Sequence, residues 1–203
     1  DKIFAIFKKE AEFYKKRGGN VLWVGHPMID LTKKLPLKKD ARNNLNLRPD
    51  QNILLLMPAS RPQELKYILP TFMLAARKLQ QKYPSLIVYI PSCRKVFDER
   101  FRKAFRKYQV KGKVISQKDN ARLKPYIYSL TKIALCKSGT VNMELALHGI
   151  PQIVGYRVSR VTAFIAKRIL NFKVKFISPV NLLVNKLIIP EFVQRDFDAK
   201  KIF

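Results

Sequence analysis

The chain has 203 residues, of which 47% are hydrophobic and 27% are charged, a balance typical of globular proteins that excludes wholesale disorder. Its 41 lysines and arginines against 14 aspartates and glutamates give a formal net charge of +27, which favours polyanionic partners. No apolar run reaches the roughly 20 residues that a membrane-spanning helix needs. The amino terminus lacks a small-residue cleavage site, so we predict no signal peptide. Because the chain begins with Asp1 rather than Met, we interpret it as a piece of a longer protein.

The predicted elements alternate between apolar runs and segments of helical spacing. A strand is expected at 20–24, followed by a polar connector at 31–51 with a short helix at 40–46. The later strands are expected at 52–57, 86–90, 113–116, 132–136 and 152–156, and the helices between them at 63–83, 95–108, 121–129 and 140–148. This alternation predicts an α/β fold, a Rossmann-like parallel sheet with helices on both faces.

The cysteines and histidines do not indicate a metal site. Cys93 and Cys136 lie far apart in apolar surroundings, so we expect buried, reduced thiols. His26 and His148 add no spacing typical of zinc ligands. We predict neither a metal nor a cofactor.

Two strand-to-helix corners carry residues that core packing does not require. The first is "MPASRPQE" (57–64), and the second contains Ser138, Gly139 and Thr140 directly after the strand "KIALC". In open parallel sheets ligands bind at the carboxyl ends of the strands, and helix N-termini suit phosphate groups. Arg61 adds a fork of donors matched to phosphate oxygens, and Glu144 could accept hydrogen bonds from a ribose.

Each corner also has a simpler explanation as a helix start. Ser60 is a good cap, Pro62 fits the first helical position and Glu64 is a favourable first-turn acid, while Glu144 lies close to another helix N-terminus. Taken together, the corners favour a nucleotide-sugar or dinucleotide site. The sequence has neither G-x-G-x-x-G nor G-x-x-x-x-G-K-[ST], which disfavours a nicotinamide cofactor or an ATPase.

A family resemblance rests on these same motifs. In order, "GHPMID", "MPASRPQE", "ALCKSGTVNMELALHGIPQIVGYR", "AKRIL" and "VNLL" with "IIPEFVQ" resemble the motifs of the lipid-A-disaccharide synthases, over Val24 to about Phe197. The family comprises inverting glycosyltransferases with two Rossmann-like domains, the GT-B architecture. The resemblance implies that residues 31–203 form the UDP-sugar-binding half and that residues 1–30 are the connection to, or the end of, an amino-terminal domain absent from this chain.

The resemblance also implies a reaction and its partners. The donor would be UDP-2,3-diacylglucosamine and the acceptor 2,3-diacylglucosamine 1-phosphate (lipid X), giving lipid A disaccharide 1-phosphate and UDP without a metal or cofactor. The protein would be cytoplasmic and peripheral to the inner membrane, or stromal in a plastid. A homodimer is left open.

The resemblance assigns roles residue by residue. Ser60 and Arg61 would hold the diphosphate, with Arg61 in the catalytic role of stabilising the leaving UDP. The other expected donor-binding residues are Glu64, Ser138, Gly139, Thr140, Glu144, Arg157 and Asn181. The general base is unknown and is expected in the absent domain.

Two positions depart from the family pattern. Ala59 stands where the family usually has Gly, and a Cβ there restricts the backbone beside the phosphate site. Val180 precedes Asn181 where the family usually has Pro.

The segment 157–175 has the composition of an interfacial amphipathic helix. Val161, Phe164, Ile165 and Ile169 recur at helical spacing among basic residues, which favours an anionic membrane surface as a partner. A surface helix with solvated bases explains the same pattern.

Other functions remain open. Another GT-B protein that uses a UDP-sugar, such as the peptidoglycan N-acetylglucosaminyltransferase or a UDP-N-acetylglucosamine epimerase, is the alternative enzyme, and an inactive remnant is a third reading. A basic nucleic-acid-binding module ranks below these. Phe97, Phe101, Phe105 and Tyr108 recur at steps of three and four, which favours a helix core over base stacking.

Overall fold

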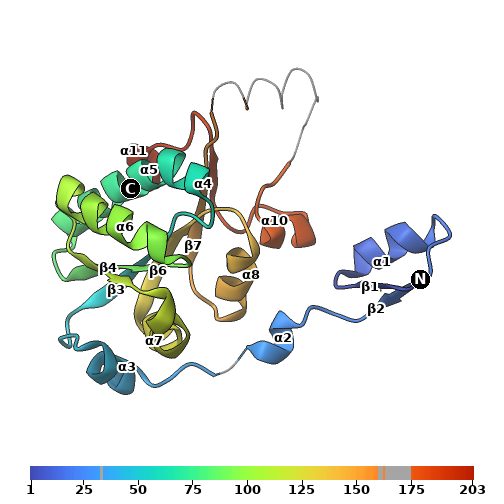
Figure 1. Ribbon diagram of the computed structural model, residues 1–203, viewed down its shortest axis with the longest axis horizontal. Helices are drawn as coiled ribbons and strands as arrows, with labels where there is room; N and C mark the ends of the chain where they lie inside the picture. Colours follow the sequence, from blue (N-terminus) through green and yellow to red (C-terminus); the bar gives the residue numbers. More distant parts are fainter. Residues whose placement is uncertain (33, 160–161, 163–174) are drawn as a thin grey trace. The chain divides into compact units, whose positions relative to one another are not determined.

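The structure is a computed structural model that describes residues 1–32, 34–159, 162 and 175–203, and it contains two compact units, Asp1–Lys34 and Leu35–Phe203 (Figure 1). The boundary lies within the predicted polar connector. That the first unit ends an amino-terminal domain and the second binds a UDP-sugar remains a prediction.

The first unit is a small βαβ element. It contains β1 (Ile3–Ala5), α1 (Lys8–Lys15), β2 (Val21–Trp23) and α2 (Met28–Leu31). The two strands pair in parallel around a cluster of only Ala5, Ala11 and Val21. The predicted strand at 20–24 is therefore present, but Leu22 and Trp23 are 44% and 53% exposed rather than buried. A two-stranded sheet is too small to cover both of its faces.

The second unit contains a six-stranded parallel sheet in the order β5-β4-β3-β6-β7-β8. Its strands are β3 (Asn52–Met57), β4 (Leu86–Pro91), β5 (Gly112–Ile115), β6 (Thr131–Cys136), β7 (Gln152–Tyr156) and β8 (Glu191–Val193). Its helices are α3 (Lys38–Leu45), α4 (Pro62–Tyr67), α5 (Leu69–Lys82), α6 (Lys95–Tyr108), α7 (Gln117–Leu130), α8 (Thr140–Leu147), α10 (Pro179–Val184) and α11 (Ala199–Ile202). The predicted α/β fold with a parallel sheet is confirmed.

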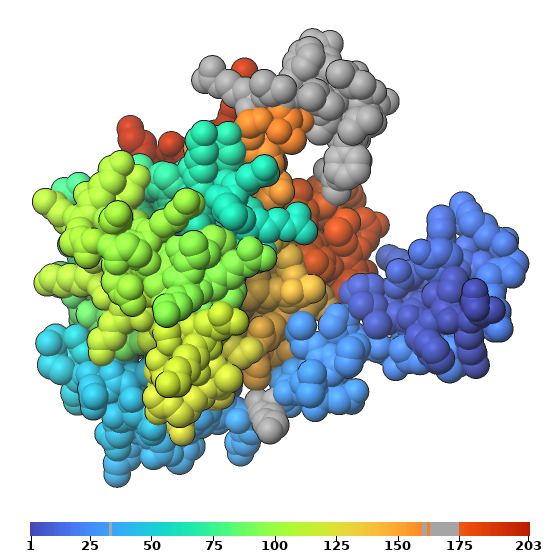
Figure 2. All heavy atoms as spheres, viewed as in Figure 1, coloured from blue at the N-terminus to red at the C-terminus, as the bar shows by residue number. Residues whose placement is uncertain are grey.

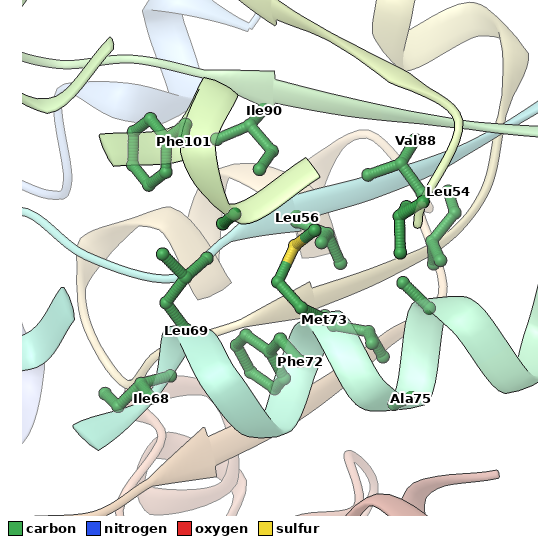
Figure 3. Packing of buried hydrophobic residues seen from close by; sticks show 14 of the residues in the cluster. Leu54, Leu56, Ile68, Leu69, Phe72, Met73, Ala75, Val88, Ile90 and Phe101 are labelled. Carbon is green, nitrogen blue, oxygen red and sulfur yellow. The ribbon is translucent and has the colours of Figure 1, made fainter. Parts of the chain in front are cut away.

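Helices cover both faces of this sheet because its central strand is apolar on both sides. In β3, Leu54 and Leu56 pack into one cluster with α4, α5, α6 and α11, and Figure 3 shows them facing Phe72 and Met73 of α5. Ile53 and Leu55 point the opposite way, into a second cluster with α3, α7, α8 and α10. Figure 1 shows α5 and α6 on one side of the sheet and α3 and α7 on the other.

Some predicted elements differ in detail. The helix expected at 63–83 is divided into α4 and α5, because Pro70 has no N–H to continue the hydrogen-bond ladder. The three-residue strand β8 was not expected. Cys93 is exposed, contrary to prediction, because it lies in the corner after β4, whereas Cys136 is buried. Phe97 and Phe101 are core residues, as the spacing indicates.

Candidate functional site

The two predicted corners lie next to each other at the carboxyl edge of the sheet. β3 and β6 are neighbouring parallel strands with Met57 opposite Cys136, and the N–H of Lys137 donates to the Met57 carbonyl at 3.1 Å. Both strands therefore lead into their helices, α4 and α8, at the same rim. This is the edge at which parallel α/β proteins bind ligands.

Glu64 organises the first corner. One oxygen of its carboxylate accepts hydrogen bonds from the N–H groups of Ser60 and Arg61, at 2.6 and 2.9 Å. Burial by itself would raise the pKa of Glu64, but donation by Ser60, Lys137 and Arg61 outweighs it and lowers that pKa. The backbone amides of Ser60 and Arg61, which we expected to be available to a phosphate, therefore already donate to the Glu64 carboxylate.

A lysine outside the predicted set connects the two corners. The Nζ of Lys137, the first residue after β6, lies 3.0 Å from the second carboxylate oxygen of Glu64. The side chains are only 18% and 11% exposed, so the pair is largely shielded from solvent. Because the two residues follow different strands, their ion pair fixes one corner against the other.

Buried amide side chains organise the second corner. Asn142, fully buried, accepts from the N–H of Gly139 at 2.8 Å and donates to the Lys137 carbonyl at 3.2 Å. Its side-chain amide also donates to the side-chain oxygen of Gln152 on β7, and the Gln152 amide donates to the backbone carbonyl of Asn142. Ser138 donates through its hydroxyl to the carbonyl of Ile177. These hydrogen bonds fix the turn that begins α8.

Glu144 lies one turn into α8 and faces α7. Its carboxylate pairs with Lys124 at 2.5 Å, and its side chain is 22% exposed. Burial and then the nearby Glu144 raise the pKa of Tyr128. A ribose contact by Glu144 remains a prediction, and such a contact would compete with Lys124.

A basic groove of 510 Å³ lies beside the first corner. Figure 2 shows α4 and α6, two helices that contribute to it, as neighbours on one face of the second unit. Its charged and aromatic lining comprises Arg61, Glu64, Lys66, Tyr67, Arg100, Tyr156 and Arg157. The structure therefore brings Arg61, Glu64 and Arg157 together in this groove. The other predicted donor-binding residues do not line it: Ser60, Ser138, Gly139, Thr140, Glu144 and Asn181.

Arg157 has structural partners of its own. Its guanidinium donates to the carbonyls of Gln194 and Phe197 and lies over the Phe197 ring. That ring packs so closely on Gly155 that a Cβ there would lie 2.1 Å from a ring carbon. The motif "GYR" thus anchors the 194–197 turn, and a donor contact by Arg157 remains a prediction.

Asn181 is fully buried and holds the segment around α10. Its amide donates to the Ile189 carbonyl and to Glu191, and its oxygen accepts from the N–H groups of Ile188 and Ile189. All the hydrogen-bonding capacity of this side chain is satisfied within the chain. In this structure Asn181 supports a loop, and its predicted contact with the donor is untested.

Three important residues were missed by the sequence analysis: Lys137, Asn142 and Glu191. Glu191 accepts from the N–H groups of Ile177 and Ser178 and from Asn181. Lys137 and Asn142 lie inside the motif that drew attention to the second corner. Lys137 directly follows a buried strand and Asn142 is a polar residue in the first turn of α8, which were the available signals, but Glu64 and Gln152 pair with them from other elements.

The described residues provide no group of three or more metal-ligating side chains. Within the same part of the chain, no helix is both long and apolar enough to cross a membrane. The segment predicted to bind a membrane, 157–175, falls mostly outside the described residues.

Solved structures share the fold of this chain. WaaG, described as a glycosyltransferase involved in lipopolysaccharide biosynthesis, aligns with 99% of this chain and 50% of its own at a TM-score of 0.60 and 12% identity. The UDP-GlcNAc 2-epimerase of Neisseria meningitidis, solved bound to UDP-GlcNAc, covers 90% of the chain and 50% of its own at a TM-score of 0.54 and 16% identity. The fold is that of one half of a GT-B protein.

Sequence comparison shows the family of the chain. The family model described as lipid-A-disaccharide synthetase matches residues 1–203, and the chain belongs to this family. It is 48% identical over 202 residues to the lipid-A-disaccharide synthase of Prochlorococcus marinus and 39% identical over 202 residues to that of Gloeothece citriformis. Both alignments cover 100% of the chain, but only 52% and 51% of the relatives, so the chain spans about half their length.

Proposed function

We propose that the chain is the donor-binding half of a lipid-A-disaccharide synthase. The complete enzyme would transfer 2,3-diacylglucosamine from UDP-2,3-diacylglucosamine to lipid X, releasing lipid A disaccharide 1-phosphate and UDP. Membership of the family supports this reaction. The observation that carries the role of this half is the adjacency of the two corners, with Met57 opposite Cys136 at one rim.

In this proposal the two corners hold the donor diphosphate. Arg61 stabilises the negative charge that develops on the departing UDP, a task for which its fixed fork of donors is suited. Thr140 begins the eight-residue helix α8, whose N-terminus favours negative charge. Glu144 binds the ribose after releasing Lys124. The general base comes from the half of the enzyme that this chain does not contain.

The acceptor and the acylated donor are lipids, so the enzyme works at a membrane surface. We propose a peripheral, cytoplasmic location against anionic lipid. The formal charge of +27 supports this electrostatically. Flotation with vesicles should increase with anionic lipid content and decrease with salt.

Binding of nucleotides by calorimetry tests the proposed function. We expect the folded chain to bind UDP, and the Arg61→Ala variant to bind it at least about tenfold more weakly. Failure of the folded wild-type chain to bind UDP would contradict the proposal. Comparing acylated UDP-glucosamine with UDP-N-acetylglucosamine separates this family's donor from that of the epimerases.

A further inference from the structure

Lys137 ties the two corners together, and its charge lies close to both of them. Its ammonium is 3.0 Å from Glu64 and 3.4 Å from the Ser138 carbonyl. A Cβ built on Gly139 would lie 3.5 Å from the same nitrogen. The positive charge is therefore held beside the first turn of α8 as well as against the first corner.

The negative charge of Glu64 should repel a diphosphate bound at the first corner. Its side chain is only 11% exposed, and its carboxylate accepts hydrogen bonds from the amides of Ser60 and Arg61. A diphosphate that approaches this corner would meet a like charge that water screens poorly. The same carboxylate is needed locally, because it caps the N-terminus of α4.

We propose that Lys137 is a positioning residue of the donor site, whose ammonium neutralises Glu64 so that the corner after β3 accepts a diphosphate. This inference rests on the proposed function, since it concerns the same nucleoside diphosphate. Lys137 acts through Glu64 and is not itself required to contact the phosphates. The capping carboxylate can then remain in place while the net charge of the pair is zero.

A purely structural role for Lys137 makes a different prediction. If the lysine only ties two loops together, then removing the charge of Glu64 cannot repair its loss. If it neutralises Glu64, then the Glu64→Gln substitution removes the repulsion and restores binding. Gln also retains an oxygen that can accept from the backbone amides, as in a capping box.

The test compares four variants with the wild-type chain by calorimetry with UDP. They are Lys137→Met, Glu64→Gln, the double variant and Lys132→Met, a control that removes an exposed lysine near the opposite end of β6. We expect Lys137→Met to weaken UDP binding at least about tenfold, and the control to change it less than about twofold. Glu64→Gln and the double variant should each bind UDP within about threefold of wild type.

The pH dependence gives a second readout. Donation by Lys137 is one of the contacts that lower the pKa of Glu64, so Lys137→Met raises that pKa. As the pH falls and Glu64 becomes protonated, the ratio of the dissociation constants of Lys137→Met and wild type should approach one.

The outcomes separate the two proposals. If wild type binds UDP but Lys137→Met binds it equally well, or if the double variant binds as weakly as Lys137→Met, the role of Lys137 is overturned while the proposed function stands. If the folded wild-type chain does not bind UDP, the proposed function fails and this inference fails with it. Unfolding curves for each variant confirm that the proteins compared are folded.

Discussion

At the residue scale, Gly155 is a position where an added methyl group would overlap a buried aromatic ring. A Cβ there would lie 2.1 Å from a carbon of the Phe197 ring, which is fully buried in the core cluster beside α5. We expect Gly155→Ala to lower the free energy of unfolding by about 1–3 kcal/mol, as for other overpacked cores. Denaturant unfolding measures this change.

Gly139→Ala is the matched control for that substitution. The nearest atom to its Cβ would be Lys137 Nζ at 3.5 Å, which is ordinary contact, and its backbone is extended. Its effect on stability should stay below about 1 kcal/mol. Equal losses for the two alanine variants would show that the close approach to Phe197 is not the cause.

Glu64 should also make stability depend on pH. Its pKa is lowered in the folded chain, so its contribution is complete above the unfolded value of 4.5 and is lost as the pH falls through the folded value. The difference in unfolding free energy between wild type and Glu64→Gln should therefore shrink below about pH 4.5. Denaturant unfolding at a series of pH values measures it.

Glu99→Gln serves as the comparison, because Glu99 pairs with Arg106 at 3.0 Å on the exposed face of α6. Added salt should remove most of the effect of that surface pair but less of the effect of Glu64, which is shielded. If added salt abolished the stability changes caused by Glu64→Gln and by Glu99→Gln to the same extent, the shielding of Glu64 would be contradicted.

Residue identities at the corners could be predicted, but their partners could not. Ser60, Arg61 and Ser138 stand out because they follow apolar strands, and the strands place them at one rim. The pairing of Glu64 with Lys137 brings together residues 73 positions apart, which no local pattern encodes. The burial of Asn181 likewise depends on Glu191 and on a loop that returns over α10.

At the element scale, α10 and β8 are held together by one carboxylate. Glu191 accepts from the N–H groups of Ile177 and Ser178 and from Asn181. We expect Glu191→Ala to reduce stability by about 2–3 kcal/mol, because charge-assisted hydrogen bonds are lost. Amide hydrogen exchange should show reduced protection at Asn181 and Leu182.

Asp196→Ala is a suitable control, since Asp196 pairs with Lys201 where both side chains are exposed. We expect Asp196→Ala to change the free energy of unfolding only slightly, because exposed ion pairs contribute little to stability. If loss of the Glu191 carboxylate left the exchange of α10 amides unchanged, its proposed bridging role would be wrong.

Element types were predictable wherever apolar spacing was regular. The strands at 52–57 and 152–156 agree with the observed bounds. The predicted helix 63–83 is divided at Pro70, whereas α7 continues through Pro125, so the apolar stripe alone does not fix where a helix breaks. β8 has only three residues and pairs with β7, so it forms through tertiary contacts rather than through its own pattern.

At the scale of the whole molecule, the second unit contains both large hydrophobic clusters. Their members all lie beyond residue 34, while the first unit contributes a separate cluster of three residues. We expect residues 35–203 to unfold cooperatively as an isolated fragment and to retain UDP binding. Limited trypsin digestion should cut first near Lys34, in the basic connector.

Circular dichroism and calorimetry on the purified fragment would check both statements. A fragment that fails to fold would contradict the independence of the second unit. A folded fragment that has lost UDP binding would place part of the nucleotide site in residues 1–34.

The central claim, that the corners after β3 and β6 hold the diphosphate of a UDP-sugar, is tested most directly by mapping amide chemical shifts during a UDP titration. We expect the largest changes at residues 58–61 and 137–141, with little change at Gln51 and Thr131, near the opposite ends of the same strands. Changes confined to that opposite edge or to the exposed basic face of α6 would contradict the account.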